Sequence, residues 1–176
     1  MNKITRSIIT AIAAVATVAF PVEAQRKSNY SHHVLLGQAI RSTGIDYKIN
    51  PKACWEKSAS GWYWAYKNEF VVCQENKRYV GVEEVWTEED LDTVRHEATH
   101  LIQDCVDGVR QGALVSVYKD PIDLAKEILG DRGIRGVLGA YSEASYHVKV
   151  MELEAFSVAS MNDPMDQVRD INKFCF

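Results

Sequence analysis

Residues 91–104, with the sequence LDTVRHEATHLIQD, constrain the fold more than any other stretch of the chain. Apolar residues recur there at three- and four-residue spacing, which predicts an α-helix with a buried apolar stripe. His96 and His100 lie in the middle of this helix. Residues four apart share one face of a helix, so the two imidazoles can bind a single metal ion. The fold must therefore bring any further ligand to this face.

Both ends of this helix are marked in the sequence. Thr87 is a suitable N-cap, and the acidic run 88–90 follows it at the positive end of the helix dipole. Gly108 is expected to end the helix. These signals favour a helix over a loop. The remaining alternative is a helix whose histidines only pack or face solvent.

The spacing His96-Glu97-x-x-His100 is that of zinc hydrolases. The two histidines ligate Zn²⁺, and Glu97 is turned towards an activated water, for which it is the candidate catalytic general base. Catalytic zinc sites use three protein ligands and leave one position open. One ligand must therefore come from elsewhere in the chain.

Glu152 and Glu154 are the candidates for the third ligand. They lie in a predicted helix that is mostly apolar, where an unpartnered buried carboxylate would be costly. Two residues apart on a helix, they face nearly opposite sides, so only one of them can ligate the ion. Glu152 shares its face with small residues and Glu154 with larger apolar ones. The residues alone leave this choice open.

The combination of His96-Glu97-x-x-His100 with a later Glu152-x-Glu154-Ala155 resembles the gluzincin branch of the zincin metallopeptidases. It looks most like small members of that branch with an E-x-E-A or E-x-x-A signature. In those proteins the first glutamate is the ligand, so the resemblance implies a metal site of His96, His100 and Glu152. It covers two helices, and its first motif is much more specific than its second.

One position departs from the gluzincin pattern. The acidic or amide residue often found after E-x-E-A is replaced here by Phe156. The support for the non-ligating nitrogens of the histidines is therefore unassigned, and Asp92, Asp104 or a backbone carbonyl could provide it.

Two other zincin arrangements can be tested on the residues. The metzincin pattern requires Gly and His where this chain has Gln103 and Val106, so it fails. His147 as third ligand would give an all-histidine site, but it lies at the start of its predicted helix. His147 or Tyr146 could instead stabilise an oxyanion, although an ordinary place on the helix surface is favoured for both.

Residues 1–24 have the pattern of a secretory signal peptide. Lys3 and Arg6 precede an apolar run of about thirteen residues, and small residues lead to a cleavage site before Gln25. An uncleaved membrane anchor is the alternative. Removal of this segment changes the formal net charge from −4 to −5. We therefore expect a secreted or periplasmic protein with no membrane association after cleavage, and no basic patch that would bind nucleic acid.

Export makes disulfide bonds possible for the four cysteines, all of which follow the signal segment. Four cysteines allow three pairings, and the sequence cannot choose among them. We favour Cys54 with Cys73, which would join a hairpin, and Cys105 with Cys175, which would tie the chain end to the metal helix. Cysteine ligation of the metal is disfavoured because no C-x-x-C spacing is present.

The other elements follow from caps and alternation. Helices are predicted at 32–42, from Asp120-Pro121 to about 129, at 142–161 and from Asp163-Pro164 to about 175. Strands are predicted at 45–49, 62–66 and 70–73, the last two as a β-hairpin, with a further strand at 78–82. The glycine-rich stretch 131–141 is expected to be a surface loop. Residues 25–176 are expected to form one domain.

Together these features predict an α+β fold: a small zincin-like domain in which a short antiparallel sheet with a hairpin packs on the His-Glu-x-x-His helix, beside further helices. The expected function is that of a zinc metallopeptidase acting on peptides or proteins, which an edge strand within 70–82 would align. Two alternatives remain: a non-catalytic zinc-binding protein, and a zinc amidase acting on cell-wall peptides. The sequence leaves the oligomeric state open.

Overall fold

The computed structural model describes residues 30–106, 108, 110, 112–161 and 163–176. The predicted signal peptide, 1–24, lies outside these residues. The described chain has the predicted α+β composition, with a three-stranded sheet and six α-helices. The elements are α1 (Tyr30–Ser42), β1 (Asp46–Ile49), η2 (Lys52–Trp55), β2 (Gly61–Trp64), η3 (Ala65–Lys67), β3 (Glu69–Val72), α2 (Glu88–Cys105), α3 (Pro121–Ile128), α4 (Gly130–Ala140), α5 (Tyr146–Met161) and α6 (Pro164–Phe174).

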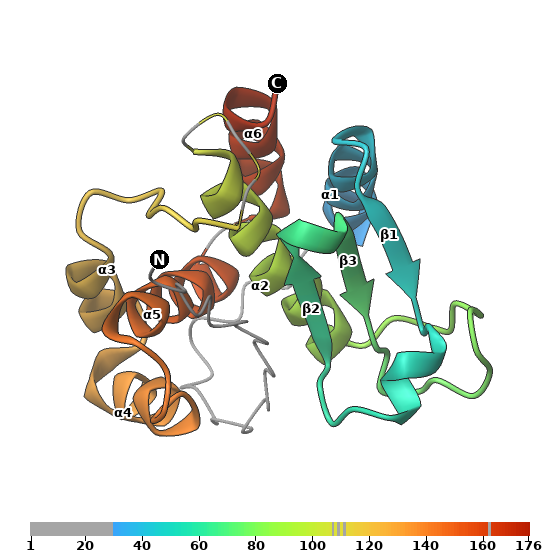
Figure 1. Ribbon diagram of the computed structural model, residues 1–176, viewed down its shortest axis with the longest axis horizontal. Coiled ribbons are helices and arrows are strands. Elements are labelled where there is room, and N and C mark those ends of the chain that lie inside the picture. The colour runs from blue at the N-terminus through green and yellow to red at the C-terminus, as the bar shows by residue number, and fades with distance from the viewer. Residues whose placement is uncertain (1–29, 107, 109, 111, 162) are drawn as a thin grey trace, which may run out of the picture.

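Helix α2 lies at the centre of the molecule (Figure 1), between the sheet and the group formed by α3, α4 and α5. It begins as predicted, because Thr87 forms a reciprocal capping box with Asp90. From Leu91 to Cys105 every residue except Asp92 is buried. Polar groups buried on a central helix need partners inside the protein. The polar residues of α2 therefore decide much of the surrounding architecture.

The predicted hairpin is confirmed, but the sheet is mixed. Strand β2 pairs antiparallel with β3, and β1 pairs parallel with β3 on its other side, which gives the order β1-β3-β2. Two expectations are therefore wrong: the sheet is not purely antiparallel, and β3 is its central strand rather than an edge. The strand nearest α5 is β2 (Figure 1), so the sheet edge beside the centre of the molecule belongs to β2.

Residues 78–82 form turns and irregular structure rather than the predicted strand. Tyr79, Val80 and Val82 are exposed. The β-branched and aromatic side chains that favoured a strand here therefore do not pack against a core. Gly81 has a positive φ of 72° and donates its N–H to the carbonyl of Asn50. A left-handed residue bonded outside a ladder is incompatible with a regular strand.

The stretch 131–141, predicted as a loop, is mostly helical and forms α4. Its glycines lower helix propensity, but Val137 and Tyr141 are buried against α3 and α5 in one apolar cluster. Tertiary packing therefore overrides local propensity here. Helix α5 begins at Tyr146, later than the predicted residue 142, and the hydroxyl of Ser145 accepts the N–H of Val148 at its start.

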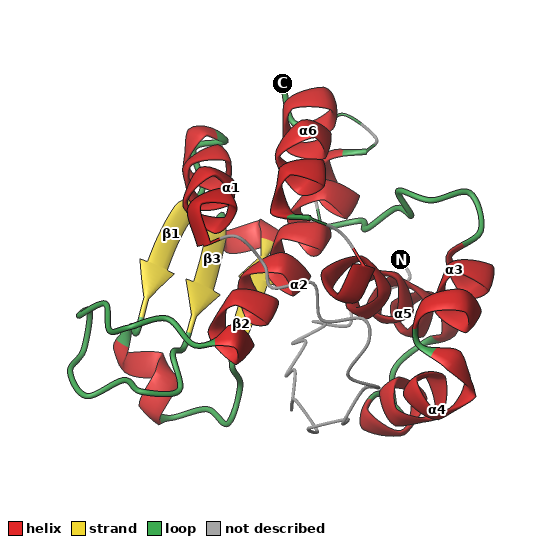
Figure 2. Ribbon diagram, turned by 180° about the vertical axis from the view of Figure 1, so that it is seen from behind, coloured by secondary structure: helices red, strands yellow, loops and turns green. Residues whose placement is uncertain are grey.

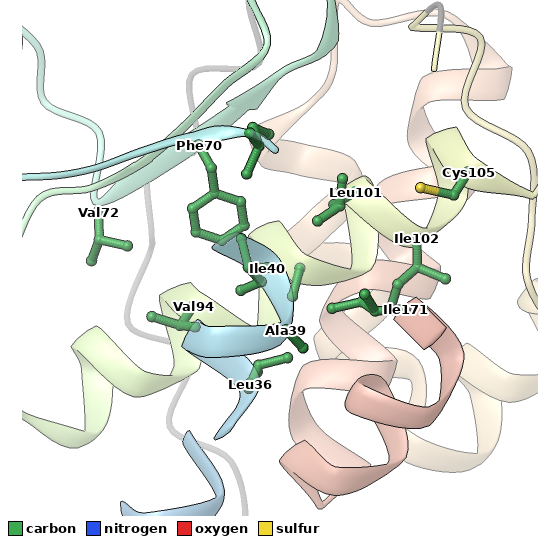
Figure 3. Packing of buried hydrophobic residues seen from close by; sticks show 12 residues of the cluster. Leu36, Ala39, Ile40, Phe70, Val72, Val94, Leu101, Ile102, Cys105 and Ile171 are labelled. Carbon is green, nitrogen blue, oxygen red and sulfur yellow. The ribbon is translucent and has the colours of Figure 1, made fainter. Parts of the chain in front are cut away.

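The main hydrophobic core lies between α1, the sheet, α2 and α6 (Figure 2). Phe70 of β3 is fully buried there and stacks on Tyr47 of β1 with ring centroids 5.0 Å apart. Burying a side chain of this kind contributes about 2–3 kcal/mol. Figure 3 shows how the contributing elements converge through Leu36, Ala39, Ile40, Phe70, Val72, Val94, Leu101, Ile102, Cys105 and Ile171.

Both favoured disulfides are present. Cys54–Cys73 joins η2 to the end of β3, and Cys105–Cys175 joins the end of α2 to the end of α6. Disulfides of this kind persist in oxidising, extracellular-type environments. Within the described part of the chain, no helix combines the length and the apolar character needed to cross a lipid bilayer.

Candidate metal centre

Two helices supply the candidate ligands. His96 and His100 project from one face of α2, as their spacing predicts, and Glu152 projects towards them from α5. The three residues are 6%, 4% and 2% exposed. The structure thus brings together the three residues that the gluzincin resemblance selects, although 52 to 56 positions separate the glutamate from the histidines.

The ligand atoms form a nearly equilateral triangle. His96 Nε2 lies 3.2 Å from His100 Nε2, and Glu152 Oε2 lies 3.3 Å and 3.5 Å from these two nitrogens. A tetrahedral ion with bonds of 2.0–2.1 Å requires ligand atoms separated by about 3.3–3.4 Å. These three atoms could therefore ligate one small divalent cation with little rearrangement.

The hydrogen bonding of the triangle also points to a cation. Glu152 Oε2 is buried and, within the described part of the chain, has no well-formed hydrogen bond besides its contacts of 3.3 Å and 3.5 Å with the two histidine nitrogens. An uncompensated buried carboxylate oxygen is expensive, whereas a bound cation would compensate it. No cysteine competes for this role, because all four form disulfides.

The charges of the three residues influence one another. Burial alone would raise the pKa of Glu152, but the positive charges of His100 and His96 lower it well below its ordinary value. Burial alone would lower the pKa of His100, but the charge of Glu152 raises it to about 9. The buried carboxylate therefore remains anionic and attracts positive charge to this position.

Glu97 lies beside the triangle without being part of it. Its Oε2 accepts the backbone N–H of Tyr63, on β2, over 2.8 Å. Burial raises the pKa of Glu97, against the opposing effect of the two histidines. One oxygen is thus fixed by the sheet edge, and the carboxyl group is held next to the candidate ligands.

Tyr141 is a site residue that the sequence did not reveal. It is the C-cap of α4, and its hydroxyl is buried with no hydrogen-bond partner in the described structure. Burial and then the negative charge of Glu152 raise the pKa of this hydroxyl, so it stays protonated at neutral pH. Tyr141 therefore places a protonated hydroxyl group beside Glu152 at the candidate metal centre.

The second nitrogens of the histidines have different surroundings. His100 Nδ1 lies 2.8 Å from Oε1 of Gln103, a residue that the sequence-based interpretation did not select. His96 Nδ1 has no hydrogen-bond partner in the described structure; its ring packs against Phe156 with centroids 4.4 Å apart. Phe156, at a position where gluzincins often have a polar residue, thus packs against the His96 ring instead of accepting a hydrogen bond from it.

Asp104, one of the groups considered for supporting the histidines, is bonded to β2 and to Gly112. Its carboxylate accepts the hydroxyl of Tyr63 over 2.5 Å and the backbone N–H of Gly112 over 2.6 Å. Asp92, the other acidic candidate, is bonded to Arg95. The side-chain support for His100 therefore comes from an amide rather than a carboxylate.

The other candidates lie away from the triangle. Glu154 is completely buried and faces the segment 116–118 instead of the ligands. His147 is exposed and its Nε2 lies 2.9 Å from the carbonyl oxygen of Leu114. Tyr146 is 77% exposed. Neither His147 nor Tyr146 belongs to the ligand cluster.

Comparison of the chain with protein-family models, with curated proteins and with solved structures found no match. Function must therefore be inferred from the chemistry of the centre. It contains three groups that can hold a cation, a carboxylate beside them and a buried hydroxyl donor. This set can bind a metal, accept a proton and donate a hydrogen bond.

Proposed function

We propose that this protein is an exported zinc metallopeptidase of the gluzincin type, hydrolysing peptide bonds in peptides or proteins. The observation that carries the proposal is the triangle of His96 Nε2, His100 Nε2 and Glu152 Oε2, with edges of 3.2–3.5 Å, next to Glu97. Two histidines and one carboxylate are a usual ligand set for hydrolytic zinc, which keeps one coordination position open.

A bound zinc ion supplies Lewis acidity, which makes water a usable nucleophile near neutral pH and polarises the scissile carbonyl. Glu97 then acts as the general base: it takes the proton from the attacking water and delivers it to the leaving amine. The Tyr63 N–H orients this carboxylate through one oxygen, which leaves the other free to face the water.

Tyr141 stabilises the developing oxyanion in this mechanism. Its hydroxyl is protonated and buried beside Glu152, so it can donate to negative charge that develops at the centre. Preorganised donors of this kind make a large contribution to acyl-transfer catalysis. Tyr141 takes the role that the sequence suggested for His147 or Tyr146.

Strand β2 is the element that we propose aligns the substrate. Tyr63 pairs with Phe70 in the register of β2 with β3, and its N–H points away from β3 to Glu97. An extended peptide could add to this edge by main-chain hydrogen bonds. The alignment role that we expected for residues 70–82 thus passes to β2.

The proposal is tested on the full chain, produced in a host that exports it into an oxidising compartment. Elemental analysis should find about one zinc per chain, and a diverse peptide library should be cleaved. A chelator should abolish cleavage, and added zinc should restore it. Failure to bind zinc even after reconstitution would refute the proposal. Zinc binding without cleavage would favour a non-catalytic zinc protein, and cleavage confined to cell-wall peptides would favour the amidase.

A further inference from the structure

Gln103 makes contacts on both sides of the candidate metal centre. It is fully buried on α2, one turn after His100. Its Oε1 lies 2.8 Å from His100 Nδ1, and its Nε2 donates to the carbonyl of Met151 over 3.1 Å and to Glu154 Oε2 over 2.7 Å. One amide group therefore connects a histidine of α2 with two residues of α5 that lie on either side of Glu152 in the sequence.

The orientation of this amide is determined by its acceptors. A backbone carbonyl can only accept a hydrogen bond, and both Met151 O and Glu154 Oε2 lie on the same side of Gln103. The NH₂ group must face them, so the oxygen must face His100. The imidazole Nδ1 must then carry the proton, which leaves the lone pair on Nε2, where the candidate metal triangle needs it.

Glu154 is held in place as an acceptor by a different segment. Its Oε1 accepts the N–H of Tyr118 over 2.8 Å and lies 2.7 Å from the hydroxyl of Ser116, while its Oε2 also accepts the N–H of Val117 over 3.2 Å. The N–H of Val115 in turn donates to the backbone carbonyl of Gln103. The segment 115–118 thus holds the Glu154 carboxylate in place, and this carboxylate orients the Gln103 amide.

We propose that Gln103 and Glu154 are positioning residues that hold His100 in the tautomer with the proton on Nδ1, and so keep Nε2 available for metal. This inference rests on the proposed metal site and adds two residues that never touch the ion. It gives Glu154, the alternative candidate for the third ligand in the sequence, a defined task. Partners of ligating histidines typically change metal affinity 10- to 100-fold when they are mutated.

Glu154→Gln tests the orientation directly. The amide introduced at position 154 is expected to keep its oxygen on the short Tyr118 N–H bond, which turns its NH₂ group towards Gln103. Two NH₂ groups would then face each other. We expect the Gln103 amide to flip, at the cost of its bond to Met151 O, and to present its NH₂ group to His100. The imidazole would have to accept at Nδ1, and the proton would move to Nε2.

Gln103→Glu creates the opposite mismatch, because two carboxylates would face each other with no donor between them. The double variant Gln103→Glu with Glu154→Gln exchanges the two groups. Its new amide, on α5, can donate to its new carboxylate, on α2, and that carboxylate again accepts from His100 Nδ1. The bond to Met151 O and the bond from the Val117 N–H are then lost. The exchange should therefore restore the tautomer that each single change disturbs.

Two readouts separate this inference from the proposed function. Long-range ¹H–¹⁵N NMR of the histidine rings in zinc-stripped protein reports the tautomer, with His100 assigned by its absence in His100→Asn. The spectra are recorded at a pH well above 9, where the metal-free His100 ring is neutral. Wild type and the double variant should show the proton on Nδ1, and Glu154→Gln should show it on Nε2. Chelator competition should find zinc affinity weakened 10- to 100-fold in both single variants and mostly recovered in the double.

Gln167→Glu is the matched control. Gln167 is also fully buried, and it donates to the Arg95 carbonyl and to Thr99 on the same helix α2. It should lower the melting temperature without moving the tautomer or the zinc affinity. A wild-type His100 protonated on Nε2, or single variants that bind zinc like wild type, would overturn the inference. If the protein proves not to bind zinc, the tautomer of His100 can still be measured and interpreted.

Discussion

The backbone N–H of Tyr63 donates to Oε2 of Glu97 over 2.8 Å, which joins the free edge of the sheet to the middle of α2. Gly61 makes this contact possible. A Cβ at position 61 would lie 2.7 Å from the Thr93 side chain and 2.7 Å from the carbonyl of Val71. The strand and the helix are therefore too close for any larger residue at this position. The proposed base and the proposed substrate edge are fixed relative to each other.

Glu97→Gln should keep the fold and the zinc but lower peptide hydrolysis by about 10²–10⁴-fold. The amide oxygen of the variant can still accept the Tyr63 N–H, but an amide cannot take a proton from water. Turnover and zinc content are measured on the same preparation. Unchanged turnover would show that Glu97 is not the base, and loss of zinc would mean that it is a ligand.

Glu152→Ala and Glu154→Ala should weaken zinc binding to different degrees. Loss of Glu152 removes a ligand, so zinc affinity and activity should both collapse. Loss of Glu154 removes no ligand but deletes the acceptor of Gln103 and of the segment 116–118, so affinity should fall about 10- to 100-fold while a site remains. Isothermal titration or chelator competition compares the two. Tight binding in Glu152→Ala and none in Glu154→Ala would reverse the ligand assignment.

Tyr141→Phe should preserve fold and zinc affinity and lower kcat by about 10²–10³-fold, because it deletes one preorganised donor to the oxyanion. The Phe ring keeps the packing of Tyr141 against the α3–α5 cluster. Tyr146→Phe, on an exposed residue outside the ligand cluster, is the control and should behave as wild type. A fully active Tyr141→Phe would remove this residue from the mechanism.

The bond between Cys105 and Cys175 should contribute more stability than the bond between Cys54 and Cys73. The sequence separations are 70 and 19 residues, and the entropy lost by the unfolded chain grows with the length of the closed loop. Loop-closure estimates are about 4 and 3 kcal/mol. Chemical denaturation of the two double-alanine variants measures the difference. Alkylation of the intact protein under denaturing conditions should detect no free thiol.

Asp163 should stabilise the fold in a pH-dependent manner. It caps α6 by accepting the Met165 N–H, and it pairs with His32. The Met165 N–H, and then His32, hold its pKa below the usual 3.8. A depressed pKa in the folded state means that the contribution is present above about pH 4 and is lost as the pH falls through the folded-state value. Asp163→Ala should cost about 1 kcal/mol at pH 7, and its deficit should shrink as the pH is lowered below the folded-state pKa.

The elements that the sequence predicted well carry their own local signals. Thr87, Asp120-Pro121 and Asp163-Pro164 each begin a helix as expected. Helix α4 was missed because its glycines resemble a loop and its stability comes from packing against other helices. The parallel pairing of β1 was missed because the pairing of distant strands leaves no local trace.

In the candidate site, too, the residues with local sequence signals were predicted and those that depend on tertiary contacts were missed. The positions of His96, Glu97 and His100 follow from helical periodicity, and the family resemblance selected Glu152, which the structure places beside them. Tyr141 could not be found, since it ends a stretch whose glycines resemble a loop. Gln103 entered only as a mismatch to another motif. Its role depends on Met151 and Glu154, about 50 residues away in the sequence.

The Cys105–Cys175 bond turns the intervening chain into a covalent ring. Glu152 lies within this ring, and the two histidines lie on the helix that leads into it. One peptide-bond cut between the two cysteines would therefore release no fragment, and both halves of the metal centre would remain on one molecule. Separation would require reduction or a second cut. Under the proposed function, in which the protein is exported and is itself a peptidase, a single cut by a peptidase would thus leave the two parts of the chain linked.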